Sequence, residues 1–160
     1  MMESRAKLLG HPIHPMLIVF PLGLLATAVI IDIVYFVGGA LIFAELRHYL
    51  IIAGLIGGAV AAPFGLIDWL AIPSNTRAKR IGALHGGGNV VVLLLFLASA
   101  LLRGKLPSAP PVAAYVCSFA GAALALVTAW LGGELVDRLG IGISDGAHAD
   151  ASSSLRHRTT

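Results

Sequence analysis

Five polar side chains that could bind a metal ion or a haem lie beside long apolar segments of this sequence. His11 and His14 precede the first apolar segment, and His85 begins the third. Asp68 lies near the end of the second segment, and Glu134 ends the fourth. Imidazoles and carboxylates are costly at the edge of a hydrocarbon layer, so their presence there indicates function by default. Imidazole nitrogens combined with carboxylates suit iron, zinc, copper and nickel better than magnesium or calcium.

Four apolar segments must position these side chains. A helix needs about 20 apolar residues to cross a hydrocarbon core of roughly 30 Å, and residues 16–37, 49–72, 82–102 and 112–135 have that length. The links are short, so helices that follow one another should be antiparallel. The sequence therefore predicts an all-α, integral membrane, up-down-up-down four-helix bundle over residues 1–143. A polar, disordered tail is predicted for residues 144–160.

Composition supports a membrane protein and excludes two other classes. The chain is 58% hydrophobic and 12% charged, with a mean hydropathy of +0.90, whereas soluble domains average about 25% charged residues. The net charge of +3 is too small and too dispersed for a nucleic-acid-binding stripe. The expected partner is a lipid bilayer. Eight basic residues fall on the side of the two termini and three on the other side, which predicts cytoplasmic termini.

The predicted topology brings the five polar residues to one side of the membrane. Asn89 follows His85 by one helical turn on the same face, so His11, His14, His85 and Asn89 form the candidate cofactor site. Asp68 and Glu134 join the three histidines as candidate metal ligands. Two imidazoles could also be the axial ligands of a haem whose propionates meet Arg77, Lys79 or Arg80. The alternative is that the histidines only anchor the chain at the interface and the carboxylates pair with arginines.

Two functions of different classes follow from this arrangement. The leading hypothesis is a membrane electron-transfer protein that binds haem or a transition metal (iron, zinc or copper) and meets a redox partner in the membrane. The alternative is a non-redox small transporter or packing subunit that uses the cluster as a proton or cation site. Transporters often contain internal repeats, and none is convincing in this sequence. Enzymatic activity is the least favoured hypothesis, because no activated nucleophile lies near the cluster.

Two further features concern packing. Gly54 and Gly58 form a small-residue face that lets helices approach closely. Packing within the bundle is favoured there over a seam between two copies, which leaves homo-oligomerisation open. On the side opposite the termini, Asp32 and His48 are expected to form a structural pair.

Several motifs resemble one known family. The opening Gly10-His11-Pro12-Ile13-His14-Pro15 is similar to the start of the DUF2231 family of small predicted membrane proteins of bacteria. The segments 65–68, 85–89 and 133–143 are similar to that family as well. The resemblance implies a multi-pass protein of the bacterial plasma membrane, and because some relatives are joined to redox modules it favours haem or metal binding. It implies no catalytic residue.

Overall fold

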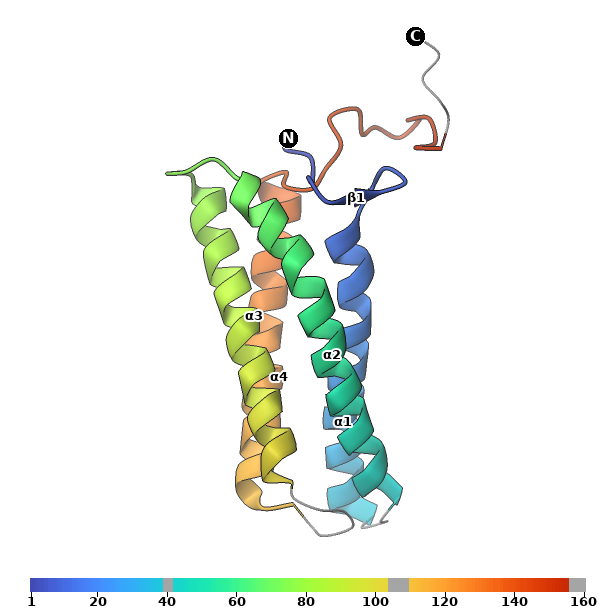
Figure 1. The fold of residues 1–160 in the computed structure, drawn as a ribbon, viewed down its shortest axis with the longest axis vertical. Coiled ribbons are helices and arrows are strands. Elements are labelled where there is room, and N and C mark those ends of the chain that lie inside the picture. The colour runs from blue at the N-terminus through green and yellow to red at the C-terminus, as the bar shows by residue number, and fades with distance from the viewer. Residues whose placement is uncertain (39–41, 104–109, 156–160) are drawn as a thin grey trace.

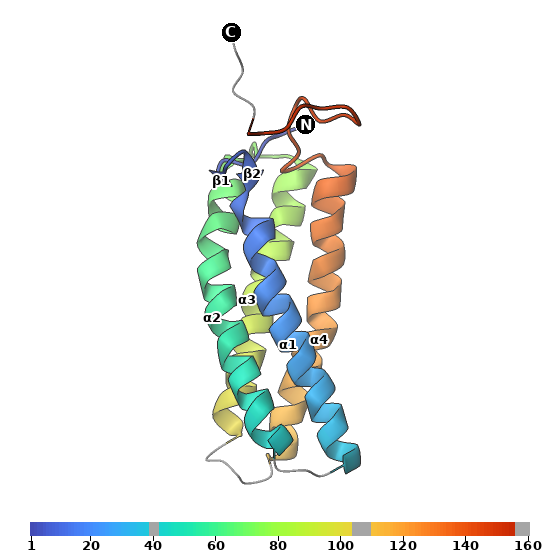
Figure 2. The same cartoon turned by 90° about the vertical axis from the view of Figure 1, so that its right-hand side faces the viewer.

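The computed structural model describes residues 1–38, 42–103 and 110–155. Within these ranges the elements are β1 (Lys7–Leu8), β2 (His11–Pro12), α1 (Ile13–Gly38), α2 (Ile42–Ala71), α3 (Arg77–Leu102), α4 (Val112–Gly133) and the π-helical turn η1 (Glu134–Arg138). The predicted all-α class is confirmed, and four helices are long and apolar enough to cross a membrane. Figures 1 and 2 show them as one elongated bundle, with the described parts of both ends of the chain at the same end.

The helices α1, α2 and α3 begin earlier than the apolar segments suggested. α1 begins at Ile13 and includes Pro15, because a proline is tolerated in the first turn, where its missing N–H has no partner to lose. α3 begins at Arg77, and the Thr76 side chain accepts a hydrogen bond of 3.1 Å from the Lys79 backbone N–H. The basic first turn of α3 is too polar for a hydropathy pattern to reveal, but the Thr76 cap stabilises it.

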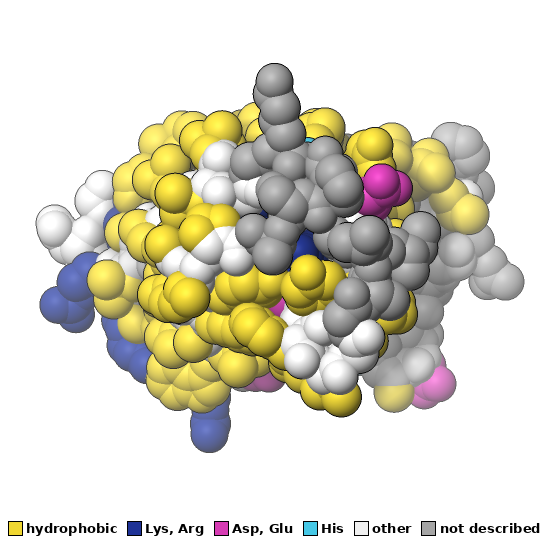
Figure 3. All heavy atoms as spheres, turned by 90° about the horizontal axis from the view of Figure 1, so that it is seen from below, with side chains coloured by type: hydrophobic (Ala, Val, Ile, Leu, Met, Phe, Trp, Pro, Cys, Tyr) yellow, Lys and Arg dark blue, Asp and Glu magenta, His cyan; other side chains and the backbone are white. Residues whose placement is uncertain are grey.

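The sides of the bundle are apolar. Large hydrophobic side chains on different helices are well exposed, including Val37 at 87%, Leu101 at 74% and Leu126 at 75%. Figure 3, which views the bundle from its loop end, shows apolar side chains over much of the surface that is not drawn in grey. A soluble protein rarely exposes continuous apolar patches of this kind, so the surface is solvated by hydrocarbon.

The helices pack as two hairpins. α1 packs most extensively on α2 and α3 on α4, while the contacts between the hairpins are smaller. Buried apolar side chains from α1, α2 and α3 form the core between them: Leu25, Ala28, Ile51, Val92, Phe96 and Ala100. A Cβ atom added at Gly54 would lie 2.6 Å from Leu25, and one at Gly58 would lie 2.6 Å from Leu93. The small-residue face of α2 therefore contacts α1 and α3.

The two hairpins repeat each other in register. Gly54 of α2 approaches Leu24 and Leu25 of α1. In the second hairpin, Gly121 of α4 approaches Leu95 and Phe96 of α3. The residue numbers of equivalent positions in α1 and α3 differ by one fixed amount. Those of equivalent positions in α2 and α4 differ by a second fixed amount.

Burial follows the same repeat. The pairs of equivalent residues Ala28 and Ser99, Asp32 and Arg103, Ile51 and Ser118, and Ala61 and Thr128 are all buried. The sequence had shown no convincing repeat, because most equivalent positions hold different apolar or small residues. The two hairpins lie side by side, and what repeats between them is the set of buried positions rather than the residue types.

The described part of the tail lies on the N-terminal segment. A left-handed backbone at Leu9 and Gly10 turns β1 into the antiparallel strand β2. The backbone N–H of Asp145 donates to Glu3, and Ser154 Oγ lies 3.2 Å from His11 Nε2. Residues 156–160 of the predicted disordered tail lie outside the described residues.

Candidate functional site

Two histidines occupy equivalent positions in the two hairpins. His14 of α1 places its Nδ1 atom 3.0 Å from the backbone carbonyl oxygen of Ala61 in α2. His85 of α3 places its Nδ1 atom 2.8 Å from the carbonyl oxygen of Thr128 in α4. A carbonyl oxygen can only accept a hydrogen bond, so each Nδ1 atom carries the proton. A neutral imidazole in that tautomer has an unprotonated Nε2 atom that is free to bind a metal.

Glycines make room for both rings. A Cβ atom added at Gly65 would lie 2.8 Å from Cε1 of His14, and one at Gly132 would lie 3.1 Å from Cε1 of His85. These two glycines are again equivalent in the repeat. Each imidazole thus lies directly against the backbone of the partner helix, and that contact fixes the direction of its ring.

The site around His85 contains further polar groups. His14 lies within electrostatic range of His85, across the boundary between the hairpins. Asn89 Nδ2 lies 3.3 Å from His85 Nε2, and the Asn89 side-chain oxygen accepts a 2.9 Å hydrogen bond from the Thr128 hydroxyl. Asn89 thus contacts the same imidazole nitrogen that a metal would use, as its place one turn after His85 suggested.

Thr128 is a member of this site that the sequence analysis missed. Its carbonyl accepts from His85 and its hydroxyl donates to Asn89. The available signal was a polar residue within the apolar fourth segment. That signal is weak, because Thr hydroxyls within membrane helices commonly bond to their own backbone, as Thr128 also does with the Ala125 carbonyl.

Asp68 has a different set of partners. Its carboxylate accepts from the Ser4 hydroxyl at 2.8 Å and from the backbone N–H groups of Arg5 at 2.7 Å and Ala6 at 3.2 Å. These bonds attach the N-terminal segment to the end of α2. The described contacts of Asp68 are therefore structural.

Glu134 and His11 also have other partners. Arg77 Nη2 donates to Glu134 at 2.6 Å, and the exposed His11 contacts Ser154. Among the described residues no group of three or more His, Cys, Asp or Glu side chains could hold a metal ion. The structure brings Asn89 to His85 and leaves His14 within electrostatic range of His85, but it does not gather the five expected metal ligands into one group.

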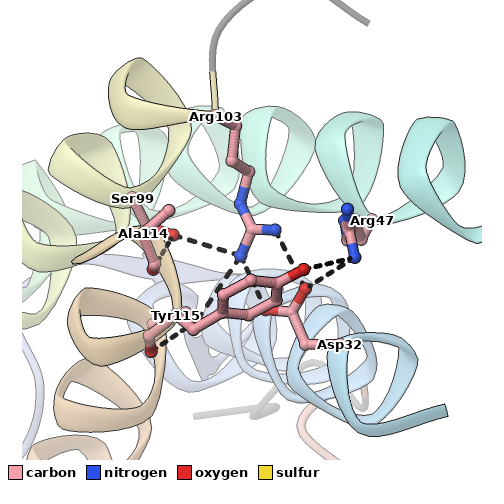
Figure 4. Close-up of polar contacts among 7 residues, drawn as sticks. Asp32, Arg47, Ser99, Arg103, Ala114 and Tyr115 are labelled. Carbon is pink, nitrogen blue, oxygen red and sulfur yellow. Dashed lines mark hydrogen bonds and ion pairs between the residues drawn. The ribbon is translucent and has the colours of Figure 1, made fainter. Parts of the chain in front are cut away.

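The opposite end of the bundle contains a buried ion cluster. Arg103 donates to the two Asp32 carboxylate oxygens at 2.9 and 2.6 Å, and Arg47 Nη1 lies 3.5 Å from the same carboxylate. Ser118 donates a further hydrogen bond of 3.1 Å to Asp32. Figure 4 shows both guanidinium groups directed toward the carboxylate. The cluster joins α1 to α2, α3 and α4.

The expected pair of Asp32 and His48 is wrong. Asp32 bonds to the two arginines, and His48 Nδ1 has no hydrogen-bond partner among the described residues. Consecutive helix residues point about 100° apart, so Arg47 and His48 cannot both face Asp32. The sequence analysis had treated Arg47 and Arg103 as loop charges because both lie at the borders of apolar segments.

Comparisons with known proteins give one match. Residues 10–145 match a family model described as Predicted membrane protein (DUF2231). No curated protein and no solved structure matches the chain.

Proposed function

We propose that this chain, which belongs to the DUF2231 family of predicted membrane proteins, binds a haem or a transition-metal ion through His14 and His85 and transfers electrons within the membrane. One observation carries the proposal. Both imidazoles donate through Nδ1 to a backbone carbonyl of the partner helix, at equivalent positions of the two hairpins. Neither Nε2 atom carries a proton in this tautomer, and that of His85 contacts the Asn89 amide.

The donor set fits such a group. Two neutral imidazoles from separate helices match the axial ligands of a haem, and imidazole also suits iron, copper and zinc. A bound haem, iron or copper would supply one-electron redox chemistry at this position. His11, Asp68 and Glu134 would have to leave Ser154, Ser4 and Arg77 to become ligands, so the proposal rests on His14 and His85.

The surrounding residues have definite tasks in this proposal. The Ala61 and Thr128 carbonyls hold the two tautomers and make the Nε2 atoms better donors, as acceptors behind a ligating histidine generally do. Asn89 contacts His85 Nε2 and would give up that contact when the nitrogen binds a metal. A redox partner within the same membrane would accept the electron.

Purified protein tests the proposal directly. Elemental analysis and a visible spectrum should reveal a stoichiometric metal or a haem. His14→Ala and His85→Ala should each abolish binding, because no equivalent imidazole can replace either ring. His11→Ala is the matched control and should retain the cofactor, since the His11 side chain is exposed and lies beside Ser154 of the tail. A colourless parent protein without stoichiometric metal would refute the proposal.

One observation favours a second function. The paired hairpins form an internal repeat, and in transporters the substrate or ion site lies at the boundary between repeats. His14 and His85 would then bind a proton or a cation in a small transporter. Reconstitution of metal-free protein in liposomes separates the two proposals: proton flux that His85→Ala abolishes supports transport.

We also propose that both termini face the cytoplasm, in the plasma membrane of a bacterium. Arg5 and Lys7 belong to the segment that holds β1, and Lys79 and Arg80 to the first turn of α3. Figure 1 shows β1 at the end of the bundle that holds the termini. At the opposite end Arg47 and Arg103 are buried in the ion cluster. Reporter fusions after Thr160 test the orientation, and activity there from a periplasmic reporter alone would contradict it.

A further inference from the structure

The buried ion cluster at the loop end has unequal charges. Arg47 and Arg103 are 1% and 2% exposed, and Asp32 is fully buried. Among the described residues Asp32 is the acidic group that contacts either guanidinium. Its carboxylate balances one of the two positive charges. A buried charge without a counter-charge is costly, and the described residues supply one negative charge for two guanidinium groups.

The unused hydrogen-bond donors belong mainly to Arg47. Its Nη1 atom contacts the Tyr115 hydroxyl at 3.3 Å and Asp32 at 3.5 Å. Its Nε and Nη2 atoms are buried and have no partner within the described parts of the chain. These two atoms form one edge of the planar guanidinium, which is the edge that binds two oxygens of a carboxylate or phosphate.

Aromatic rings hold the Arg47 side chain without using that edge. The guanidinium carbon lies 4.2 Å from the centre of the Tyr35 ring and 5.6 Å from that of Tyr115. A cation–π contact engages the face of the guanidinium, so the Nε and Nη2 donors in its plane stay free. The side chain is thus fixed in direction while its best anion-binding edge is unsatisfied.

We propose that this end of the bundle binds a phosphate-type oxyanion through the Nε and Nη2 atoms of Arg47. The anion supplies the missing negative charge and accepts the unpaired donors. Its source is either free inorganic phosphate or the phosphate of a lipid headgroup. A lipid headgroup fits the depth of Arg47 in the membrane. Arg47 lies two residues after Glu45, where the apolar span of α2 begins. The site lies at the opposite end from His14 and His85 and is independent of any cofactor.

The experiment uses the full-length protein in a maltoside detergent free of phosphate and lipid. Thermal unfolding is measured with rising inorganic phosphate, with rising short-chain phosphatidylglycerol, and with chloride at matched ionic strength. We expect saturable stabilisation by phosphate, by the lipid, or by both, and little effect of chloride. Stabilisation by the lipid alone identifies the headgroup as the source, and stabilisation by phosphate identifies a free anion.

Variants assign the effect to Arg47. Arg47→Lys keeps the charge but removes the two-donor edge, so the apparent affinity should fall by at least about tenfold. Arg77→Lys is the matched control, because Arg77 is exposed at the other end and pairs with Glu134, and it should respond as the parent does. An unchanged response of Arg47→Lys overturns the proposal. If that variant does not fold, thermal unfolding of the parent protein is the test. Equal stabilisation of the parent by chloride and by phosphate overturns the proposal.

Discussion

The two ends of the bundle use equivalent positions of the repeat in opposite ways. At the end of the termini, both hairpins carry the same residue, His14 in α1 and His85 in α3. At the loop end, the equivalent positions carry opposite charges, Asp32 and Arg103. Asp32 and Arg103 satisfy each other across the boundary between the hairpins. Two imidazoles of the same tautomer cannot do so, because both present an unprotonated Nε2 atom.

The two ends of the bundle therefore have different expected roles, stability at the loop end and ligand binding at the histidine end. The opposite charges at the loop end hold α1 against α3 through two short hydrogen bonds. The like residues at the other end each bond within their own hairpin, and we propose that they bind a cofactor between the hairpins. Loss of a residue should therefore affect folding at the loop end and ligand binding at the histidine end.

The largest expected effect is at the loop end. Asp32→Asn leaves two buried guanidinium groups without a counter-charge, and we expect a loss of about 3–5 kcal/mol in stability, measured by unfolding in detergent. The exchange of both residues, Asp32→Arg with Arg103→Asp, should recover part of the stability that either single change loses. If Asp32→Asn unfolds as the parent does, the cluster does not hold the hairpins together.

Helix contact within each hairpin gives the next effect. Gly54→Leu and Gly121→Leu should each cost about 1–3 kcal/mol, because an added Cβ atom would already lie 2.6 Å from Leu25 or 2.9 Å from Phe96. Gly23→Leu is the control, since nothing lies within 4 Å of its Cβ position. The repeat predicts similar losses for the two glycines, and a tolerated Gly121→Leu would contradict it.

At the histidine end a small substitution should alter binding rather than folding. In Gly132→Ala the new methyl group would lie 3.1 Å from Cε1 of His85 and turn the ring. We expect cofactor affinity to fall by about 10- to 100-fold, as when other supports of a ligating histidine are removed. Titration of the apoprotein measures this, with Gly133→Ala, whose Cβ position is open, as the neighbouring control. Equal cofactor affinities of the two variants would show that the direction of the His85 ring does not affect cofactor binding.

The smallest effect is expected for the exposed ion pair of Arg77 and Glu134. The Arg77 side chain is 54% exposed, so Arg77→Gln should cost between 0 and about 1 kcal/mol. Added salt should reduce the difference further. Thermal unfolding at low and high salt measures it, and a loss as large as that of Asp32→Asn would remove the contrast between the two ends.

Hydropathy along the chain was sufficient for the coarse architecture. Runs of about 20 apolar residues predict membrane helices. Hydrocarbon offers no hydrogen-bond partner, so the backbone N–H and C=O groups must bond to each other within a helix. The same reasoning predicted one level for His14 and His85; in the structure His14 lies in the first turn of α1 and His85 lies further inside α3. Residue type and helix order thus predicted the four helices, but not the burial of Arg47 and Arg103.

Rotation of each helix was decided only by tertiary packing. A membrane helix is apolar on its lipid face and on its buried face alike, so hydropathy does not show which side turns inward. For that reason the sequence pairs Asp32 with His48, whereas the structure pairs it with Arg47 and Arg103. The contact of Asp68 with Ser4 was likewise not predicted from the sequence. The repeat was hidden as well, because close packing conserves the places where helices touch, such as Gly54 and Gly121, while the apolar residues around them vary.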